Sequence, residues 1–197
     1  MSDPNIDRIA AGIKLLLMDV DGVMTDGRLY HVPNPSGGGL LEMKGFDTQD
    51  GMALQWLAWS GVQTGVISGR VSAGTEERCR QCGCTYIYQG HVEKIPILEE
   101  IFARSGFSAS QTAYVGDDLT DVVIMRRVGL AVATGNARPE VKAAAHYVTQ
   151  APGGAGAVRE AIELILTAQG KWDGILKSYL KGDRAINLTH KTETGSA

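Results

Sequence analysis

Short apolar runs alternate with helix-forming segments along most of this sequence. The first run, Ile13–Met18, is typical of a strand that is covered on both faces of a sheet. Further strands are predicted at Thr64–Ile67, Thr85–Tyr88, Ala113–Val115, Leu130–Val132 and His146–Val148. Because strands and helices alternate with short connections, the sequence predicts an α/β fold with a doubly wound parallel sheet.

The segments between these strands have helical patterns. Helices are predicted at Met52–Trp59, Ser72–Gln81, Lys94–Arg104, Leu119–Val128, Pro139–Ala145, Gly156–Ala168 and Trp172–Leu180. Residues 28–47 differ, because two apolar runs flank the turn-forming stretch PNPSGGG, which indicates a β-hairpin. No linker divides the chain. We therefore expect one domain over residues 1–181, with a hairpin flap at 28–47 and a flexible tail at 182–197.

Composition excludes several classes of protein. The 197 residues include 19 Lys and Arg against 22 Asp and Glu, so no broad cationic surface favours nucleic acid. No apolar run approaches the roughly 18 residues needed to span a bilayer. The N-terminal segment lacks the pattern of a secretory signal, so a cytoplasmic protein is expected. Cys79, Cys82 and Cys84 are too few and too close together for a disulfide framework, and reduced thiols are favoured over a zinc site.

Polar side chains with catalytic potential follow four of the predicted strands. In such sheets the ligand site lies beyond the carboxyl ends of the strands, so these groups should meet at one edge. Each motif alone could be an ordinary turn or a helix cap. Four of them at the same edge indicate a common site: Asp19, Asp21, Ser68, Arg70, Lys94 and Asp117, with Asp121 one helical turn further on.

The chemistry of these groups is that of phosphoryl transfer. Asp19 and Asp21 point to the same side of an extended chain, and clustered carboxylates call for a cation such as Mg²⁺, with Asp117 completing its site. Asp19 could then attack phosphorus as a nucleophile, while Asp21 acts as acid and base. Ser68 and Lys94 could hold the phosphoryl oxygens.

Four motifs, in the order DVDGVMTDG, VISGR, Lys94 and YVGDDLTD, resemble those of the haloacid dehalogenase superfamily of phosphohydrolases. Longer stretches, among them FDTQDGMALQWL, YQGHVEKIPIL and GGAGAVREAIELIL, resemble the phosphatases of 3-deoxy-D-manno-octulosonate 8-phosphate (KDO 8-phosphate). This resemblance runs from about Ile13 to Gly170. It implies a Mg²⁺-dependent enzyme of lipopolysaccharide biosynthesis, acting on a small sugar-acid phosphate, and a homotetramer without a large cap domain.

The resemblance also assigns roles to individual residues. Asp19 would be nucleophile and metal ligand, Asp21 would be acid and base and give its backbone carbonyl to the metal, and Asp117 would be the third ligand. Ser68 and Lys94 would bind phosphate. The positions that match substrate contacts are Asp21, Asp47, Thr48, Gln49, Asp50, Gly51, Arg70, Arg78 and Lys94.

Two departures from the pattern concern the sugar. Gln49 stands where many members have an Arg that could meet a sugar carboxylate, and Gln55 replaces a basic residue of some members. Two alternatives therefore remain open: a phosphatase for a nine-carbon, sialic-acid-type 9-phosphate, and a non-catalytic oligomerisation module related to cytidylyltransferase-fused domains. A degenerate module should have lost Asp19 or Asp21, and this chain has both.

Overall fold

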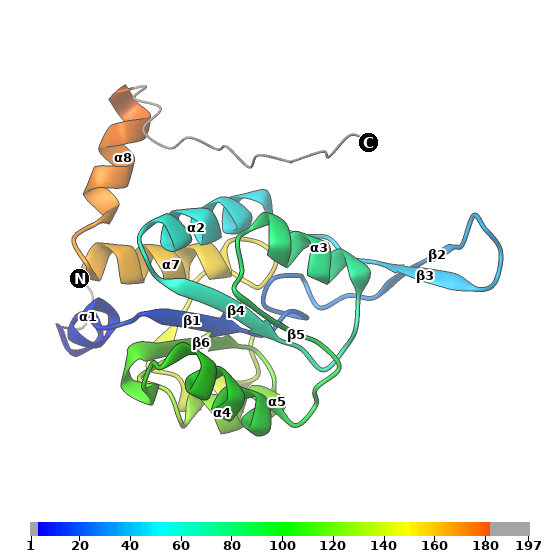
Figure 1. The fold of residues 1–197 in the computed structure, drawn as a ribbon, viewed down its shortest axis with the longest axis horizontal. Coiled ribbons are helices and arrows are strands. Elements are labelled where there is room, and N and C mark those ends of the chain that lie inside the picture. Colours follow the sequence, from blue (N-terminus) through cyan, green and yellow to red (C-terminus); the bar gives the residue numbers. More distant parts are fainter. Residues whose placement is uncertain (1–3, 182–197) are drawn as a thin grey trace.

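One six-stranded parallel sheet organises the molecule. The computed structural model describes residues 4–181, and the tail predicted at 182–197 lies outside this range. The strand order is β5-β4-β1-β6-β7-β8 (Figure 1). The strands are β1 (Leu15–Met18), β4 (Gln63–Ile67), β5 (Tyr86–Tyr88), β6 (Thr112–Gly116), β7 (Leu130–Ala133) and β8 (Tyr147–Val148). The predicted α/β fold with a doubly wound parallel sheet is confirmed.

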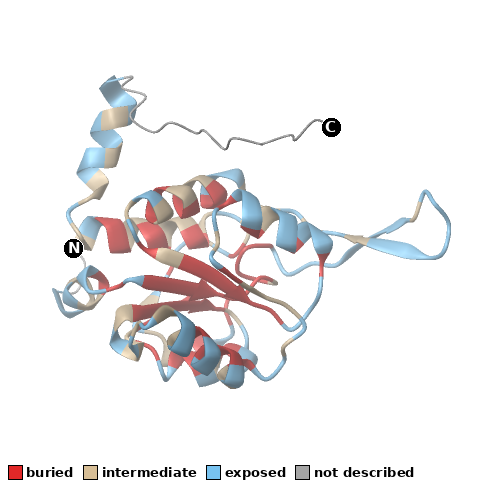
Figure 2. Cartoon of the chain, viewed as in Figure 1, coloured by how far each residue is buried: buried red, intermediate tan, exposed pale blue. Residues whose placement is uncertain are grey.

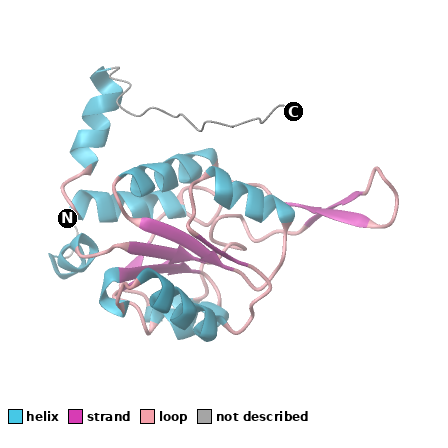
Figure 3. Ribbon diagram, in the orientation of Figure 1, coloured by secondary structure: helices cyan, strands magenta, loops and turns pink. Residues whose placement is uncertain are grey.

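Helices cover both faces of this sheet, giving three layers (Figure 3). One face packs against α1 (Pro4–Ala11), α2 (Thr48–Trp59), α3 (Ala73–Gln81) and α7 (Ala157–Ala168). The other packs against α4 (Lys94–Ser105), α5 (Leu119–Met125) and α6 (Pro139–Ala144). A short 3₁₀ turn (Ala109–Gln111) precedes β6, and α8 (Trp172–Lys181) ends the described part of the chain. Within residues 4–181, every helix is too short or too polar to cross a membrane.

The segment at 28–47 forms the predicted hairpin, from β2 (Tyr30–Pro33) and β3 (Leu40–Met43). It projects away from the sheet, and most of its residues are exposed (Figures 1 and 2). Several of these exposed side chains are large and apolar: Leu29, Tyr30, Val32, Leu40, Leu41 and Met43.

Two helix predictions were wrong or missing. The helix predicted from Met52 begins at Thr48, because the Asp47 carboxylate accepts hydrogen bonds from the backbone N–H groups of Gln49 and Asp50 and caps it. Residues 47–51, which lie before the predicted helix start at Met52, are therefore a cap and the first helical turn. Helix α1 was not predicted, since it is short and has only two large apolar side chains, Ile6 and Ile9, which pack against the core that it shares with α7.

The loop before α7 fixes the loop that follows β1. Gly154 N–H donates to Val23 O (2.9 Å), and Gly153 N–H donates to Asn136 Oδ1 (2.6 Å). A Cβ atom on Gly153 would lie 1.8 Å from Gly22 O, so only glycine allows this contact. The position of the Asp19–Gly22 segment thus depends on a backbone contact with Gly153, which is distant from it in the sequence.

We predict that Gly153→Ala lowers the free energy of unfolding by about 1–3 kcal/mol, because the new methyl group must displace the Gly22 backbone. Urea unfolding measures this change. Gly174→Ala is the matched control, since a Cβ atom at Gly174 meets nothing within 4 Å; in a helix that exchange should be neutral or slightly stabilising. Equal stability of the two variants would contradict the proposed contact.

Candidate active site

The ends of β1, β4 and β6 and the start of α4 surround one cleft of about 350 Å³, which we call the acidic cleft. Six residues predicted from strand ends line it together: Asp19, Asp21, Ser68, Arg70, Lys94 and Asp117. Gly27, Gly69, Val92, Asp118 and Thr120 complete the lining. The strand order explains the convergence, because β4, β1 and β6 are direct neighbours in the sheet.

A buried cation lies at the base of the acidic cleft. Lys94 is the first residue of α4, and its side chain is only 2% exposed. Its Nζ atom is 3.1 Å from Asp19 Oδ1 and 2.7 Å from Asp121 Oδ1. Burial alone would lower the pKa of Lys94, but the charges of Asp121 and Asp19 outweigh burial and raise it. Lys94 is therefore positively charged where it contacts both carboxylates.

Asp121 holds the neighbouring groups in place. Its Oδ1 atom accepts hydrogen bonds from Lys94 and from the Tyr114 hydroxyl, each at 2.7 Å. Its Oδ2 atom accepts from the backbone N–H groups of Asp117 (2.9 Å) and Asp118 (3.1 Å). The sequence analysis placed Asp121 one helical turn after Asp117 but gave it no role. That spacing was the signal from which its anchoring role could have been predicted.

Asp117 carries an oxygen that is available to a cation, and Asp19 carries one that already faces the Lys94 ammonium. Asp117 Oδ1 is buried and accepts no hydrogen bond within the described residues, whereas Asp19 Oδ1 is buried and lies 3.1 Å from Lys94 Nζ. Together with an oxygen of Asp121, these carboxylates lie within 4.8 Å of one another. Since both oxygens of Asp121 are already engaged, Asp19 and Asp117 are the better metal ligands of the three.

Two carboxyl groups of the acidic cleft have raised pKa values. Burial raises the pKa of Asp117 to about 7, and the negative charges of Asp121 and Asp19 contribute further. Burial also raises the pKa of Asp19 to about 6, against the opposing effect of Lys94. A divalent cation would relieve both effects.

The backbone brings Asp21 close to this pair. Gly22, the next residue, has φ +85°, and a Cβ atom there would lie 2.0 Å from Asp117 Oδ2. The chain beside Asp21 therefore runs directly past Asp117, as a backbone carbonyl ligand requires. The Asp21 carboxylate itself forms an ion pair with Lys44, at the end of the hairpin.

The phosphate-binding candidates lie on the same side of the cleft. Ser68 is buried at the end of β4, and its Oγ atom accepts a hydrogen bond from Arg70 N–H (3.2 Å). The Arg70 side chain extends to Glu42 of the hairpin, with which it forms an ion pair. Ser68 and Lys94 thus line the same cleft as Asp19, as expected of groups that hold a phosphoryl group.

The predicted substrate segment 47–51 lies outside the acidic cleft. Asp50 is buried, and its carboxylate accepts from the backbone N–H groups of Arg159 (2.8 Å) and Gly156 (3.4 Å) at the start of α7. Burial raises the pKa of Asp50 to about 6. Gln49 Oε1 accepts from Arg159 Nη1 (3.3 Å).

Arg78, predicted to contact substrate, packs against the same segment. Its Nη2 atom donates to Asp47 O (3.1 Å), and a Cβ atom on Gly51 would lie 1.9 Å from it. In this chain, Arg78 and Asp50 thus hold the first turn of α2 in place.

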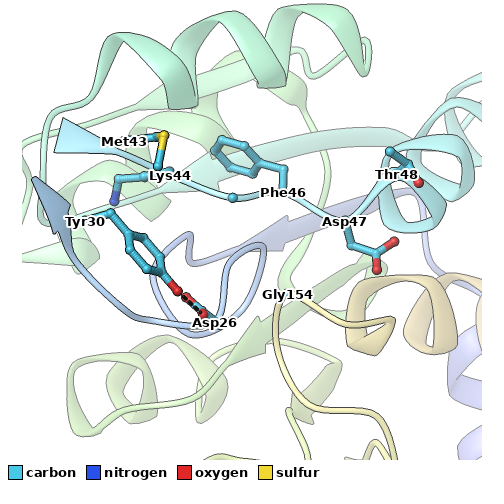
Figure 4. Close-up of a pocket in the computed structure, with 9 residues that line it drawn as sticks. Asp26, Tyr30, Met43, Lys44, Phe46, Asp47, Thr48 and Gly154 are labelled. Atoms are coloured by element: carbon cyan, nitrogen blue, oxygen red, sulfur yellow. Dashed lines mark hydrogen bonds between the residues drawn. The ribbon is translucent and has the colours of Figure 1, made fainter. Parts of the chain in front are cut away.

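Asp47 and Thr48 line a second cavity of about 600 Å³ at the base of the hairpin, which we call the hairpin cavity (Figure 4). Its other lining residues are Asp26, Tyr30, Met43, Lys44, Gly45, Phe46 and Gly154. Sequence reasoning missed Lys44, because no local pattern distinguishes a lysine after an exposed strand from a solvated one.

Comparisons with known proteins agree with this geometry. Residues 80–162 match the model of the haloacid dehalogenase-like hydrolase family. A 3-deoxy-D-manno-octulosonate 8-phosphate phosphatase of Yersinia pestis is 42% identical over 174 residues, which are 88% of this chain and 90% of that protein.

Solved structures give the same result. A probable YrbI family phosphatase from Pseudomonas syringae has a TM-score of 0.84 at 42% identity, covering 90% of this chain and 98% of that one. The 3-deoxy-D-manno-octulosonate 8-phosphate phosphatase of Moraxella catarrhalis, in complex with magnesium, phosphate and KDO, has a TM-score of 0.84 at 37% identity. It covers 90% of this chain and 99% of that one.

The raised pKa values predict how stability depends on pH. Because the folded pKa of Asp117, about 7, exceeds the unfolded value of 3.8, the metal-free folded state binds more protons between these limits. Its free energy of unfolding should therefore fall as pH rises from about 4 to 7. Asp117→Asn should remove about 1–2 kcal/mol of this fall. Urea unfolding in EDTA at several pH values tests it, and an unchanged slope in the variant would contradict the prediction.

Proposed function

We propose that this chain, which belongs to the 3-deoxy-D-manno-octulosonate 8-phosphate phosphatase family of haloacid dehalogenase-like hydrolases, hydrolyses KDO 8-phosphate to KDO and phosphate. The observation that carries the proposal is Asp19, a buried carboxylate facing Asp117 and paired with Lys94 at the end of β1. The Moraxella catarrhalis relative was solved with magnesium, phosphate and KDO, the cofactor and the two products of such a reaction.

The residues of the acidic cleft fit Mg²⁺. Asp117 offers a buried oxygen without a hydrogen-bond partner within the described residues, and Asp19 a buried oxygen that faces Lys94; burial and the neighbouring carboxylates raise the pKa of both groups, and a cation would stabilise their charged forms. We assign the metal site to these two carboxylates and the backbone carbonyl of Asp21. When bound, Mg²⁺ supplies positive charge that offsets the charge on the phosphoryl oxygens.

The proposed reaction uses these side chains in two steps. A carboxylate oxygen of Asp19 attacks phosphorus, and the bond from phosphorus to the sugar oxygen breaks. Asp21 gives a proton to the leaving oxygen, then takes one from the water that hydrolyses the aspartyl-phosphate, which regenerates Asp19 and releases phosphate. Ser68 and Lys94 hold the phosphoryl oxygens during both steps.

We place the enzyme in the cytoplasm, in lipopolysaccharide biosynthesis. The nine-carbon substrate is kept as the alternative because Gln49, engaged by Arg159, offers an amide in place of the guanidinium found in many members. A non-catalytic module is disfavoured because the nucleophile, the acid and base, and the metal ligands are all present.

Phosphate release from a panel of sugar phosphates tests the function. In the presence of Mg²⁺ we expect kcat/KM to be highest for KDO 8-phosphate and activity to be lost in EDTA. Asp19→Asn should lower kcat by at least about 10³-fold, since an amide is a poor nucleophile, and it serves as the control for contaminating phosphatases. A higher kcat/KM for a nine-carbon 9-phosphate would favour the alternative substrate.

We further propose that residues 4–181 act as one phosphatase domain whose hairpin is a flap, and that four copies form a homotetramer through their hairpins. The support is exposed apolar surface: Leu40 is 66% exposed and Leu41 45%. A lone two-stranded hairpin is barely stable in water, so such a surface favours a partner. An apolar hollow beside the acidic cleft, lined by Val92, Ile95, Pro96 and Val123 among others, offers further surface to a neighbouring copy.

Substituting Leu40 and Leu41 together by Glu should dissociate the tetramer, because charges would replace apolar side chains at the contact. Light scattering measures the mass, and Ser36→Glu, at the exposed hairpin turn, is the control. Turnover of KDO 8-phosphate should then fall much further than turnover of a small aryl phosphate. A monomeric wild type, or a dissociated variant with full sugar-phosphate activity, would refute the assembly.

A further inference from the structure

Lys44 is a cation held at the boundary between the hairpin and the catalytic groups. It follows β3 directly, and its side chain is 2% exposed. Its Nζ atom forms an ion pair with Asp21 and lies 3.4 Å from Glu42 Oε1. Because a lysine is rarely buried without a partner, its position depends on these two carboxylates.

The acidic cleft and the hairpin cavity meet at this lysine. Lys44 lines the hairpin cavity, while its partner Asp21 lines the acidic cleft. The two also meet at consecutive residues, since Asp26 lines the first and Gly27 the second. The Lys44–Asp21 ion pair thus stands at the boundary between the two cavities, and a molecule whose phosphate lies beside Asp19 would reach the larger cavity past this pair.

Lys44 is the single cation among the residues that line the hairpin cavity (Figure 4). The two carboxylates of the lining already accept hydrogen bonds from the protein. Asp26 accepts from the Tyr30 hydroxyl (3.0 Å) and from Arg28 N–H (3.0 Å), and Asp47 caps α2. A negatively charged group that enters this cavity would therefore meet Lys44.

We propose that Lys44 is a specificity-determining residue that binds the carboxylate of the sugar acid in the hairpin cavity and, in doing so, releases the Asp21 carboxyl group to the leaving oxygen. The inference rests on the proposed function and names the group that recognises the acid end of that substrate. Gln49 is uncharged and cannot bind the substrate carboxylate as a cation would. The nearby Arg159 guanidinium is engaged by Glu163 (2.6 Å) and stacks on Trp56.

This exchange of partners by Lys44 would couple binding of the substrate carboxylate to protonation of the leaving oxygen by Asp21. In the free enzyme, Lys44 occupies an oxygen of the residue that must protonate the leaving group. A substrate carboxylate offers Lys44 a second anion, so the lysine can leave Asp21 without becoming an unpaired buried charge. The phosphate ester of a sugar without a carboxyl group offers no such second anion and leaves the ion pair in place. Discrimination between the two substrates would then appear in kcat/KM.

A cycle that varies both the enzyme and the substrate tests this inference. We would measure kcat/KM of wild type and Lys44→Met on KDO 8-phosphate and on glucose 6-phosphate, which lacks a carboxylate. Lys44→Met should lower the value for KDO 8-phosphate by about 10- to 100-fold, the loss of one charge-assisted hydrogen bond. The value for glucose 6-phosphate should not fall and should rise by up to about tenfold, because the variant frees Asp21 from an ion pair that this substrate cannot open. Lys44→Arg, which keeps the charge, should retain most of the discrimination.

Lys142→Met is the matched control for loss of a lysine, because Lys142 donates to Gly135 O outside both cavities. It should leave both substrates unchanged. Calorimetric titration of free KDO into the Mg²⁺-loaded protein gives a readout that needs no turnover, with weaker binding expected in Lys44→Met. If that variant does not fold, Lys44→Gln takes its place in both measurements.

Equal losses on the two substrates would overturn the inference, since Lys44 would then serve the phosphoryl end or the fold. No loss on either substrate would overturn it as well. A wild type that does not hydrolyse KDO 8-phosphate would instead refute the proposed function, so the two failures are distinguishable.

Discussion

The ion pairs of Lys94 are the interaction on which the site depends. This single buried cation contacts the nucleophile candidate Asp19 and the anchoring Asp121, which in turn fixes Tyr114 and the backbone of Asp117. Without it, carboxylates within 4.8 Å of one another would face each other in a poorly solvated cleft. The folded chain therefore tolerates this cluster because one positive charge is present permanently and a second, from the metal, can be added.

The sheet order makes that arrangement possible. Lys94 enters after β5, Asp19 after β1 and Asp121 after β6, and the parallel strands of one sheet deliver all of them to the same edge. The loop that carries Asp21 and Gly22 is then fixed from the far end of the chain by Gly153. Catalytic geometry is thus a property of the whole sheet and its connections rather than of one motif.

The sequence was sufficient to predict the elements that have local signals. Apolar strands followed by acids, a serine or a lysine predicted the residues that line the acidic cleft, because strand ends converge by topology. Three features were beyond its reach. The first turn of α2 depends on the Asp47 cap, Asp50 binds the backbone start of α7, and Lys44 pairs with Asp21. Each of the last two joins groups far apart in the chain, and no periodicity or spacing encodes such a contact.

Ion pairs, as well as the polypeptide chain, connect the hairpin to residues of the acidic cleft. Arg70, beside Ser68, pairs with Glu42 of β3; Glu42 contacts Lys44; and Lys44 pairs with Asp21. Two cations and two carboxylates alternate along this path, so a movement of the hairpin exposes an unpaired charge unless another ion takes its place. In our proposal the carboxylate of a sugar-acid phosphate supplies that ion, and the phosphate ester of a sugar without a carboxyl group does not. A fold without a large cap would then make its proposed acid and base, Asp21, respond to the far end of the substrate, through the side chains that attach the hairpin to the sheet.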